Sequence, residues 1–385
     1  GLGLGQGDLM FFPEGGNLTV NDIIHNVRYL KPKNSYRNTL DYNNIMFIVA
    51  GEVIHRVSGL TWAEFIEQKI MQPVGMTSSY GSYNRAKAAN VDNIIDAHAP
   101  VDGKVVAVPH DWNETGNAAG GIISNIKDMN IWAEFLMNGF TTKDGKKLVT
   151  DKQIFQLWNL QIATPVALKN PYDSNFNGYG LGWFLTDVKG HKQVYHTGGL
   201  IGTVTQFTLI PDMKLGIVVL TNQQSGAAFS VITNTIKDAY LGLEDRNWLK
   251  NFSERMAKVN AKYDKEKLDV FTKSEAFKKE KKSQIKSEQI TGTYTDLWFG
   301  DVTIALEGKT LRLSCVNSPR LKGELIPYSP NVMVIKWDDR SYDADAFVNF
   351  QMDENGKAQG MKLKPISGVT DFSFDFEDLD LLKKK

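Results

Sequence analysis

Two short polar segments, Tyr42-Asn43-Asn44 and His196-Thr197-Gly198-Gly199, contain the side chains best suited to chemistry. A phenol and an imidazole can both move protons when their surroundings adjust their pKa values. The glycines of the second segment would let a ligand approach the backbone closely and leave amide N–H groups free on a strand edge. Each segment alone also fits a structural role. Asn44 could cap a helix with Tyr42 packed beneath it, and His196 could lie on an ordinary strand beside a hairpin turn.

Residues 1–245 have the patterns of one α/β or α+β unit, in which helices flank an antiparallel meander. Apolar residues at helical spacing, followed by Gly59, predict a helix just after the first polar segment. The capping-box spacing of Thr61-Trp62-Ala63-Glu64 predicts a second helix that runs to Ile70. Further helices are predicted over 124–138 and 229–240, and strands over 193–198, 202–210 and 215–221. The second polar segment therefore lies at the end of a strand.

In the remaining chain the residue pattern changes at about residue 246 and again at about residue 288. Residues 246–287 combine an amphipathic stripe with the Lys-rich run Lys278 to Lys286, and we expect a solvated helical linker. Residues 288–385 alternate with the period of strands, and Glu307-Gly308-Lys309 and Asn355-Gly356 read as turns between them. Several short strands at this spacing predict an all-β C-terminal barrel or sandwich.

Composition excludes several classes of function. Lys+Arg 44 balance Asp+Glu 44 over 385 residues, so net charge gives no reason to expect nucleic acid or an anionic membrane as partner. No segment approaches the roughly 20 apolar residues that a membrane span needs. The chain has one cysteine and six scattered histidines, which predicts neither a disulfide framework nor a dedicated metal site. We expect no metal and no other cofactor.

Taken together and in this order, the two segments resemble motifs of the serine β-lactamase and penicillin-binding protein superfamily, especially its class C β-lactamase-like branch of esterases and D-amino peptidases. Tyr42 and Asn44 match the Tyr-x-Asn element of that branch. His196-Thr197-Gly198 matches the Lys-Thr-Gly strand, with histidine in place of lysine. Three further phrases also resemble the family: Pro73-Val74-Gly75-Met76, Ala119-Gly120-Gly121-Ile122-Ile123-Ser124 and Tyr179-Gly180-Leu181-Gly182-Trp183. The resemblance covers residues 1 to about 243, and the tail resembles an uncharacterised β-rich domain that follows some of these hydrolases.

The resemblance implies a role for each matched residue. Tyr42 would share proton transfer with a lysine that lies one helical turn from the nucleophilic serine, and Asn44 would bind the carbonyl side of the substrate. The strand motif His196-Thr197-Gly198 would bind a substrate carboxylate, with His196 adjusting the electrostatics of the reaction. The N–H of Gly199 would form half of an oxyanion hole, and the N–H of the nucleophile would form the other half.

The nucleophile itself is the departure from the family pattern. The family's Ser-x-x-Lys motif comes before Tyr-x-Asn, and none precedes Tyr42. Ser124-Asn125-Ile126-Lys127 and Ser283-Gln284-Ile285-Lys286 match out of order, and we reject both because Ser124 fits a helix cap and Ser283 lies in the linker. The opening Gly1-Leu2-Gly3 resembles the family segment that follows the nucleophile helix. The sequence therefore predicts that the serine and lysine lie upstream of this chain, which would be inactive alone.

The sequence as a whole predicts a serine hydrolase of the β-lactamase-like transpeptidase fold. It would cleave a small-molecule or peptide ester or amide through an acyl-enzyme, as an esterase or D-amino peptidase more than as a true β-lactamase, a preference that depends on His196. Two alternatives stay open: a non-catalytic binding protein on the same scaffold, and a C-terminal barrel whose ligand dominates the function. The resemblance also implies a bacterial enzyme of the periplasm or the extracellular space.

Overall fold

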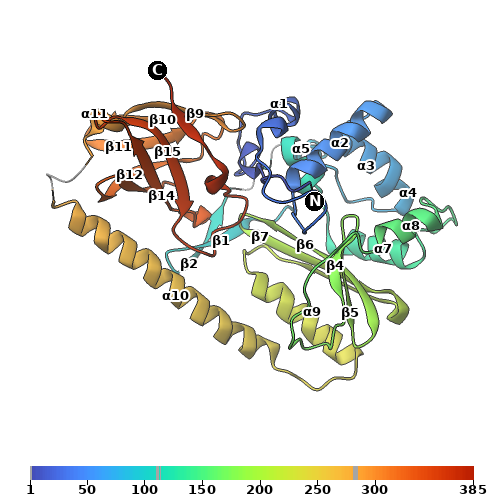
Figure 1. Ribbon diagram of the computed structural model, residues 1–385. Coiled ribbons are helices and arrows are strands. Elements are labelled where there is room, and N and C mark those ends of the chain that lie inside the picture. The colour runs from blue at the N-terminus through green and yellow to red at the C-terminus, as the bar shows by residue number, and fades with distance from the viewer. Residues whose placement is uncertain (1, 110–111, 113, 281–284) are drawn as a thin grey trace.

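The computed structural model describes residues 2–109, 112, 114–280 and 285–385, so Gly1 and Ser283 lie outside the described residues. A six-stranded sheet with helices on both sides stands next to a closed barrel (Figure 1). The predicted fold class is therefore confirmed, and its C-terminal part is a barrel and not a sandwich.

The sheet is an antiparallel meander in which each strand pairs with the next along the chain. Its strands are β3 (Ile162–Ala163), β4 (Asn177–Tyr179), β5 (Phe184–Val188), β6 (His191–Leu200), β7 (Thr203–Ile210) and β8 (Leu215–Leu220). The 3-10 turn Pro211–Met213 joins the last two strands, and proline and aspartate are residues that favour such a turn. The second polar segment lies on β6, in the middle of this sheet.

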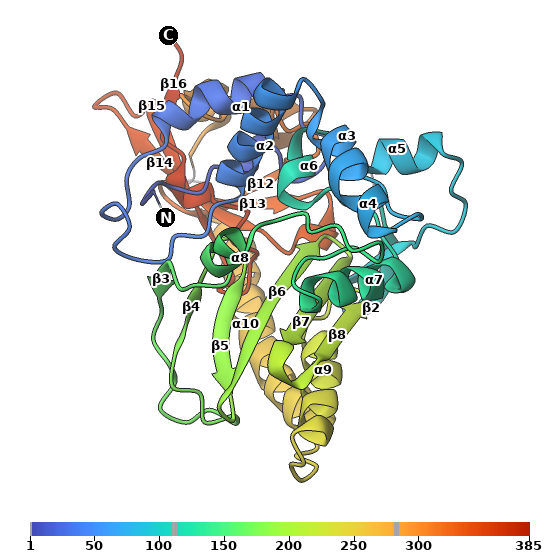
Figure 2. The same cartoon turned by 90° about the vertical axis from the view of Figure 1, so that its right-hand side faces the viewer.

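Helices cover both faces of the sheet (Figure 2). On one face, Val194 and Leu209 share a buried cluster with Leu136 of α7 (Ile126–Met137). On the other face, Ile210 and Ile217 pack with apolar side chains of α9 (Gly226–Tyr240). Strand residues alternate between the two faces, and this is why neighbouring positions belong to different clusters.

The residues before the sheet form a layer of short helices. They are η1 (Asp8–Met10), α1 (Val20–Asn26), η2 (Val27–Tyr29), α2 (Asn44–Ser58), α3 (Trp62–Ile66), the π-helical turn Glu67–Met71, α4 (Gln72–Val74), α5 (Tyr83–Ala88), η4 (Glu114–Gly116), α6 (Asn117–Gly120) and α8 (Asp151–Leu157), with the hairpin β1 (Ala97–Val101) and β2 (Lys104–Val108) between α5 and η4. Gly59 ends α2 with a φ of 74°, as its sequence predicts. The capping box of Thr61 and Glu64 is present, but the helix that it starts is interrupted by the π-helical turn.

Ser124 does not have its expected role as a helix cap. Asn125 is the N-cap of α7, and its side-chain oxygen accepts a hydrogen bond from the N–H of Asp128 at 3.0 Å. The Ser124 hydroxyl lies 2.8 Å from the hydroxyl of Ser79, which itself donates to Asp128 at 2.8 Å. An Asn side chain competes well for a helix start, and here it takes the position one residue later.

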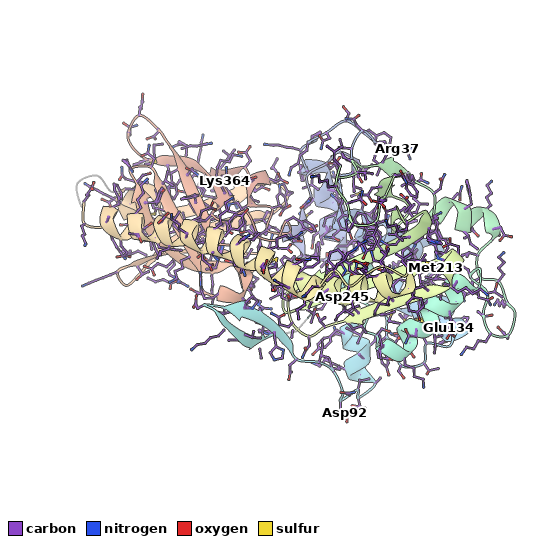
Figure 3. All side chains as sticks on the ribbon, turned by 90° about the horizontal axis from the view of Figure 1, so that it is seen from below. Arg37, Asp92, Glu134, Met213, Asp245 and Lys364 are labelled. Atoms are coloured by element: carbon purple, nitrogen blue, oxygen red, sulfur yellow. The ribbon has the colours of Figure 1, made fainter. Side chains whose placement is uncertain are left out.

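One long helix, α10 (Trp248–Phe277), connects the sheet to the barrel along the outside of the molecule (Figure 3). The short helix α11 (Ser287–Ile290) then leads into β9 (Gly292–Asp296), β10 (Gly300–Glu307), β11 (Thr310–Cys315), β12 (Lys322–Ser329), β13 (Val332–Trp337), β14 (Ala346–Met352), β15 (Ala358–Pro365) and β16 (Leu381–Lys383). Pairing of β16 with β9 closes the barrel. The predicted turns at Glu307-Gly308-Lys309 and Asn355-Gly356 lie between paired strands.

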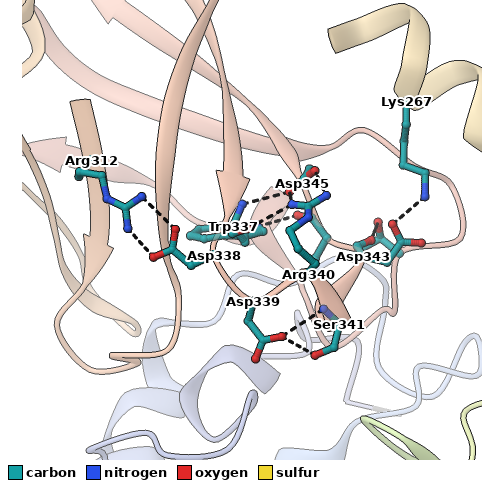
Figure 4. A network of polar contacts seen from close by, with 11 residues as sticks. Lys267, Arg312, Trp337, Asp338, Asp339, Arg340, Ser341, Asp343 and Asp345 are labelled. Carbon is teal, nitrogen blue, oxygen red and sulfur yellow. Dashed lines mark hydrogen bonds and ion pairs between the residues drawn. The ribbon is translucent and has the colours of Figure 1, made fainter. Parts of the chain in front are cut away.

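A polar network surrounds the 3-10 turn η6 (Arg340–Tyr342), which connects β13 to β14 in the barrel (Figure 4). Arg340 forms two hydrogen bonds to the carboxylate of Asp345, at 2.6 and 2.7 Å. The same carboxylate accepts the backbone N–H of Trp337, whose indole is buried in the barrel.

Among the described residues, no group of three or more His, Cys, Asp and Glu side chains could hold a metal ion.

The barrel and the first residues of the chain share one hydrophobic core. Leu9, Met10 and Ile45 belong to the same buried cluster as Trp298 and Phe299 of the barrel. In Figures 1 and 2 the start of the described chain lies between the barrel and the sheet.

Across the described chain, no single helix is long and apolar enough to cross a membrane. The helix α2 and the segment Trp62–Val74 meet the test of length and composition only as a pair, which is bent by 74°.

Candidate active site

Tyr42 brings the two polar segments together. It lies immediately before α2, and its ring centroid is 5.9 Å from that of His196 on β6. The ring also meets Tyr179 of β4 edge-to-face at 6.0 Å, and Phe372 of the barrel at 6.3 Å. Edge-to-face contacts of this kind favour one orientation of an aromatic ring. The fold therefore places a phenol, an imidazole and a strand edge around one point.

Asn44 is not the cap of α2. Asn43 takes that position, and its side-chain oxygen accepts a hydrogen bond from the N–H of Met46 at 3.0 Å. The side chain of Asn44 is consequently available for another contact, and its Nδ2 donates to the Oδ2 of Asp8 at 2.8 Å. The alternative role of Asn44 as a helix cap is therefore wrong. Asn44 lies beside Tyr42, and its amide is anchored through the nitrogen.

The hydrogen bonds of His196 define its protonation state. Its Nδ1 lies 2.6 Å from the carbonyl oxygen of Thr197, which can only accept, so Nδ1 carries the proton. Its Nε2 lies 3.0 Å from the hydroxyl of Tyr179, which then donates to it. Burial lowers the pKa of His196, and the neutral ring is the form that these two partners satisfy. At pH 7 the imidazole therefore brings no net charge to the site.

The backbone of Gly199 faces an open edge of the sheet. The N–H of Thr221 donates to the carbonyl of Val204 at 3.2 Å, so the polar backbone atoms of Val204 face β8. Gly199 pairs with Val204, and directly opposed residues that do not bond each other point their polar groups outward. The N–H of Gly199 thus points away from β7. On that side β5 pairs with β6 only as far as Tyr195.

Packing does not require a glycine at position 199. An added Cβ there would meet nothing within 4 Å, whereas at Gly198 it would lie 2.6 Å from the hydroxyl of Thr205. Thr197, Gly198 and Gly199 are all exposed. The space at Gly199 is what a ligand needs to approach the backbone of a strand edge.

A buried carboxyl group lies under the site. Burial raises the pKa of Asp8 to about 7, although hydrogen bonds from Asn44 and Ser373 act in the opposite direction. Burial, followed by the charge of Asp8, raises the pKa of Tyr42 to about 12. In these surroundings Tyr42 is a neutral phenol at pH 7, and a positive charge beside it would lower its pKa.

Three residues of this site are missing from the sequence-based prediction. Tyr179 lies in a phrase that resembles the family, but nothing in the phrase indicates a hydrogen bond to His196. Phe372 comes from the barrel, and no local pattern places it beside Tyr42. Asp8 is one acidic residue in a glycine-rich stretch, and the sequence carries no signal of its burial or of its bond to Asn44.

Comparison with known families gives two matches. The model of the family described as Beta-lactamase matches residues 2–240. A model described as a domain of unknown function, DUF3471, matches residues 278–383.

Similar proteins include an unguisins hydrolase of Aspergillus campestris, 28% identical over 54% of this chain and 38% of its own length. The D-alanyl-D-alanine-carboxypeptidase/endopeptidase AmpH of Escherichia coli is 20% identical over 51% of this chain and 49% of its own length. This chain thus spans less than half the length of these curated relatives. Among solved structures, the octameric penicillin-binding protein homologue from Pyrococcus abyssi covers 99% of this chain and 76% of its own, with a TM-score of 0.55 and 18% identity. That likeness supports the fold.

Proposed function

The chain belongs to the Beta-lactamase family, whose members are serine hydrolases, and from this premise we propose that it forms most of an active site that cleaves an ester or amide through an acyl-enzyme. The observation that carries the proposal is the meeting of Tyr42 and His196 at the open edge of β6.

In this proposal the Gly199 N–H receives the developing oxyanion, because it points to the open edge and has space before it. Thr197 shares the same strand edge and would bind the substrate next to Gly199. Asn44 presents the free oxygen end of its amide, since its nitrogen end is bound to Asp8. His196 contributes as a neutral group that orients Tyr179 and adjusts the electrostatics, and a substrate carboxylate would gain a charged partner there only at acidic pH.

Tyr42 would move the proton between the nucleophile and the leaving group. Its pKa of about 12 in the present surroundings is too high for a base at pH 7. We propose that a Ser-x-x-Lys segment upstream of this chain supplies the serine and a lysine beside Tyr42, and the positive charge of that lysine would lower the pKa of the phenol. Residues 1–385 alone would then be inactive.

The substrate preference is tested with the natural protein that includes the upstream segment. A nitrophenyl ester, a D-amino acid amide and a cephalosporin are compared by kcat/KM. We expect the ester or the amide to be the best substrate. A cephalosporin as clearly the best substrate would contradict the esterase or D-amino peptidase assignment. No turnover of any of them, with tight binding of one, would favour the non-catalytic binding protein.

The cellular location and the domain limits stay predictions. Periplasmic or extracellular location rests on the resemblance alone. A helical linker over 246–287 agrees with α10 as far as the described residues extend. Fractionation of the producing cells measures the cellular location. Limited proteolysis, with cleavage expected between α10 and β9, measures the domain limits.

A further inference from the structure

One loop of the barrel lies against the first residues of the chain. We name the segment 366–375, between β15 and the 3-10 turn η7 (Phe376–Asp378), the barrel loop. The Oδ2 of Asp375 accepts the backbone N–H groups of Gly7 at 2.6 Å and of Asp8 at 3.2 Å. Phe374 is buried and meets Phe12 edge-to-face at 5.1 Å. Buried hydrogen bonds and an aromatic contact together hold the loop in one position.

From this loop, a chain of hydrogen bonds leads to the site. The hydroxyl of Ser373 donates to the Oδ2 of Asp8 at 2.9 Å, and Nδ2 of Asn44 donates to the same oxygen at 2.8 Å. Ser373 and Asp8 are both buried. An amide that is anchored through its nitrogen has its oxygen fixed in the opposite direction. The orientation of Asn44 therefore depends on a residue of the barrel.

The neighbouring residue of the loop reaches the site itself. Phe372 meets the Tyr42 ring edge-to-face at 6.3 Å, with an interplanar angle of 87°. Its side chain is 52% exposed, although the residues after it are buried. The same Tyr42 ring also contacts Tyr179 and His196. A large apolar ring that is half exposed next to a phenol offers contact area to an apolar group of a ligand.

We propose that the barrel loop completes the active site: Phe372 forms an apolar subsite that selects substrates with a bulky aromatic or aliphatic group near the scissile bond, and Ser373 and Asp8 are positioning residues for Asn44. This inference rests on the proposed hydrolase function and extends it, because it assigns a substrate class and a role to the barrel. A barrel that only stabilises the fold would leave substrate preference independent of residue 372.

The first experiment compares two esters on the natural protein with its upstream segment. 4-Nitrophenyl acetate carries a small acyl group and 4-nitrophenyl phenylacetate a large aromatic one. Phe372→Ala should lower kcat/KM for the phenylacetate by about 10-fold or more and for the acetate by less than about 2-fold, since lost apolar contacts change discrimination by about 10–200-fold. The control is Val369→Ala, an exposed apolar residue of the same loop, which should leave the ratio unchanged. Melting curves show that each variant is folded.

The second experiment isolates the hydroxyl of residue 373. Ser373→Thr keeps the hydroxyl, and Ser373→Val differs from the Thr variant only in having a methyl group in place of that hydroxyl. The Val variant should have a kcat about 2–10-fold lower than the Thr variant with a similar KM, as expected for one buried hydrogen bond.

The outcomes separate the two claims. An active wild type whose ester ratio is the same in Phe372→Ala, or equal kcat values for the two 373 variants, overturns the role of the barrel loop while the hydrolase function stands. A wild type that hydrolyses neither ester and takes no fluorophosphonate label overturns the proposed function, and this inference with it.

Discussion

The buried carboxyl of Asp8 makes the stability of this chain depend on pH in an unusual direction. Its pKa is about 7 in the folded chain against an ordinary value of 3.8, chiefly because of burial. An acid whose folded pKa is raised contributes stability below its unfolded pKa and loses that contribution as pH rises through the folded value. We therefore predict that Asp8 destabilises the fold progressively between about pH 4 and pH 7.

The magnitude follows from the two pKa values. One pKa unit corresponds to about 1.4 kcal/mol, so ionised Asp8 costs the folded chain about 4 kcal/mol relative to the protonated form. Between pH 5 and pH 8, ionisation of Asp8 should lower the free energy of unfolding by about 2–3 kcal/mol. Asp375 lies beside Asp8 and its pKa is also raised by burial, but it accepts three backbone N–H groups. Those donors act against the rise in the pKa of Asp375, whereas the charge of Asp8 adds to it.

The assay is urea unfolding of wild type and Asp8→Asn at pH 5, 6, 7 and 8, followed by tryptophan fluorescence. The free energy of unfolding of Asp8→Asn minus that of wild type should rise by about 2–3 kcal/mol across this range. Asp380→Asn is the control: hydrogen bonds from Lys31 and Lys362 lower the pKa of Asp380 to about 2, so its difference from wild type should be constant above pH 5. A flat or falling difference for Asp8→Asn would refute the reasoning.

Three further changes have expected outcomes. In the natural protein, with the upstream segment that we propose, Tyr42→Phe should keep the melting temperature and lower kcat by about two to four orders of magnitude, as measured with the nitrophenyl ester. A kcat like that of wild type removes Tyr42 from the mechanism. Thr61→Ala removes the capping box of α3 and should cost about 1 kcal/mol in urea unfolding, whereas no loss would mean that the cap is not stabilising. Trp337→Ala empties the barrel core, since the indole is 1% exposed and donates to the Ala344 carbonyl, and should cost about 3–5 kcal/mol; a cost below about 1 kcal/mol would show that the barrel collapses around the gap.

Local signals predict the elements of this fold well. The period of apolar residues predicts α2 and the strands around the site, because burial of one face is imposed within a few residues. The alternative in which Asn44 caps α2 is wrong by one position, because Asn43 is the cap; both side chains can cap a helix, and tertiary contacts decide between them. The one-residue error at Ser124 has the same cause.

The site is predictable only where family motifs mark it. Tyr42 and His196 come from such motifs, and the structure brings them together. The contacts of Asp8, Ser373 and Phe372 join the two ends of the chain. Contacts between residues so distant in sequence leave no local pattern. The alternation of apolar and polar residues predicts the strands of the barrel, but it does not indicate whether a loop between two strands faces solvent or a neighbouring site.

The most direct test of the central claim is the position of a covalent label. The natural protein, in which we propose an upstream Ser-x-x-Lys segment, is treated with a fluorophosphonate, digested, and mapped by mass spectrometry, in parallel with Tyr42→Phe. The account predicts one adduct, on the serine of a Ser-x-x-Lys motif upstream of residue 1, with slower labelling in the variant. An adduct on a serine within residues 1–385, such as Ser124, or no adduct at all, would contradict it.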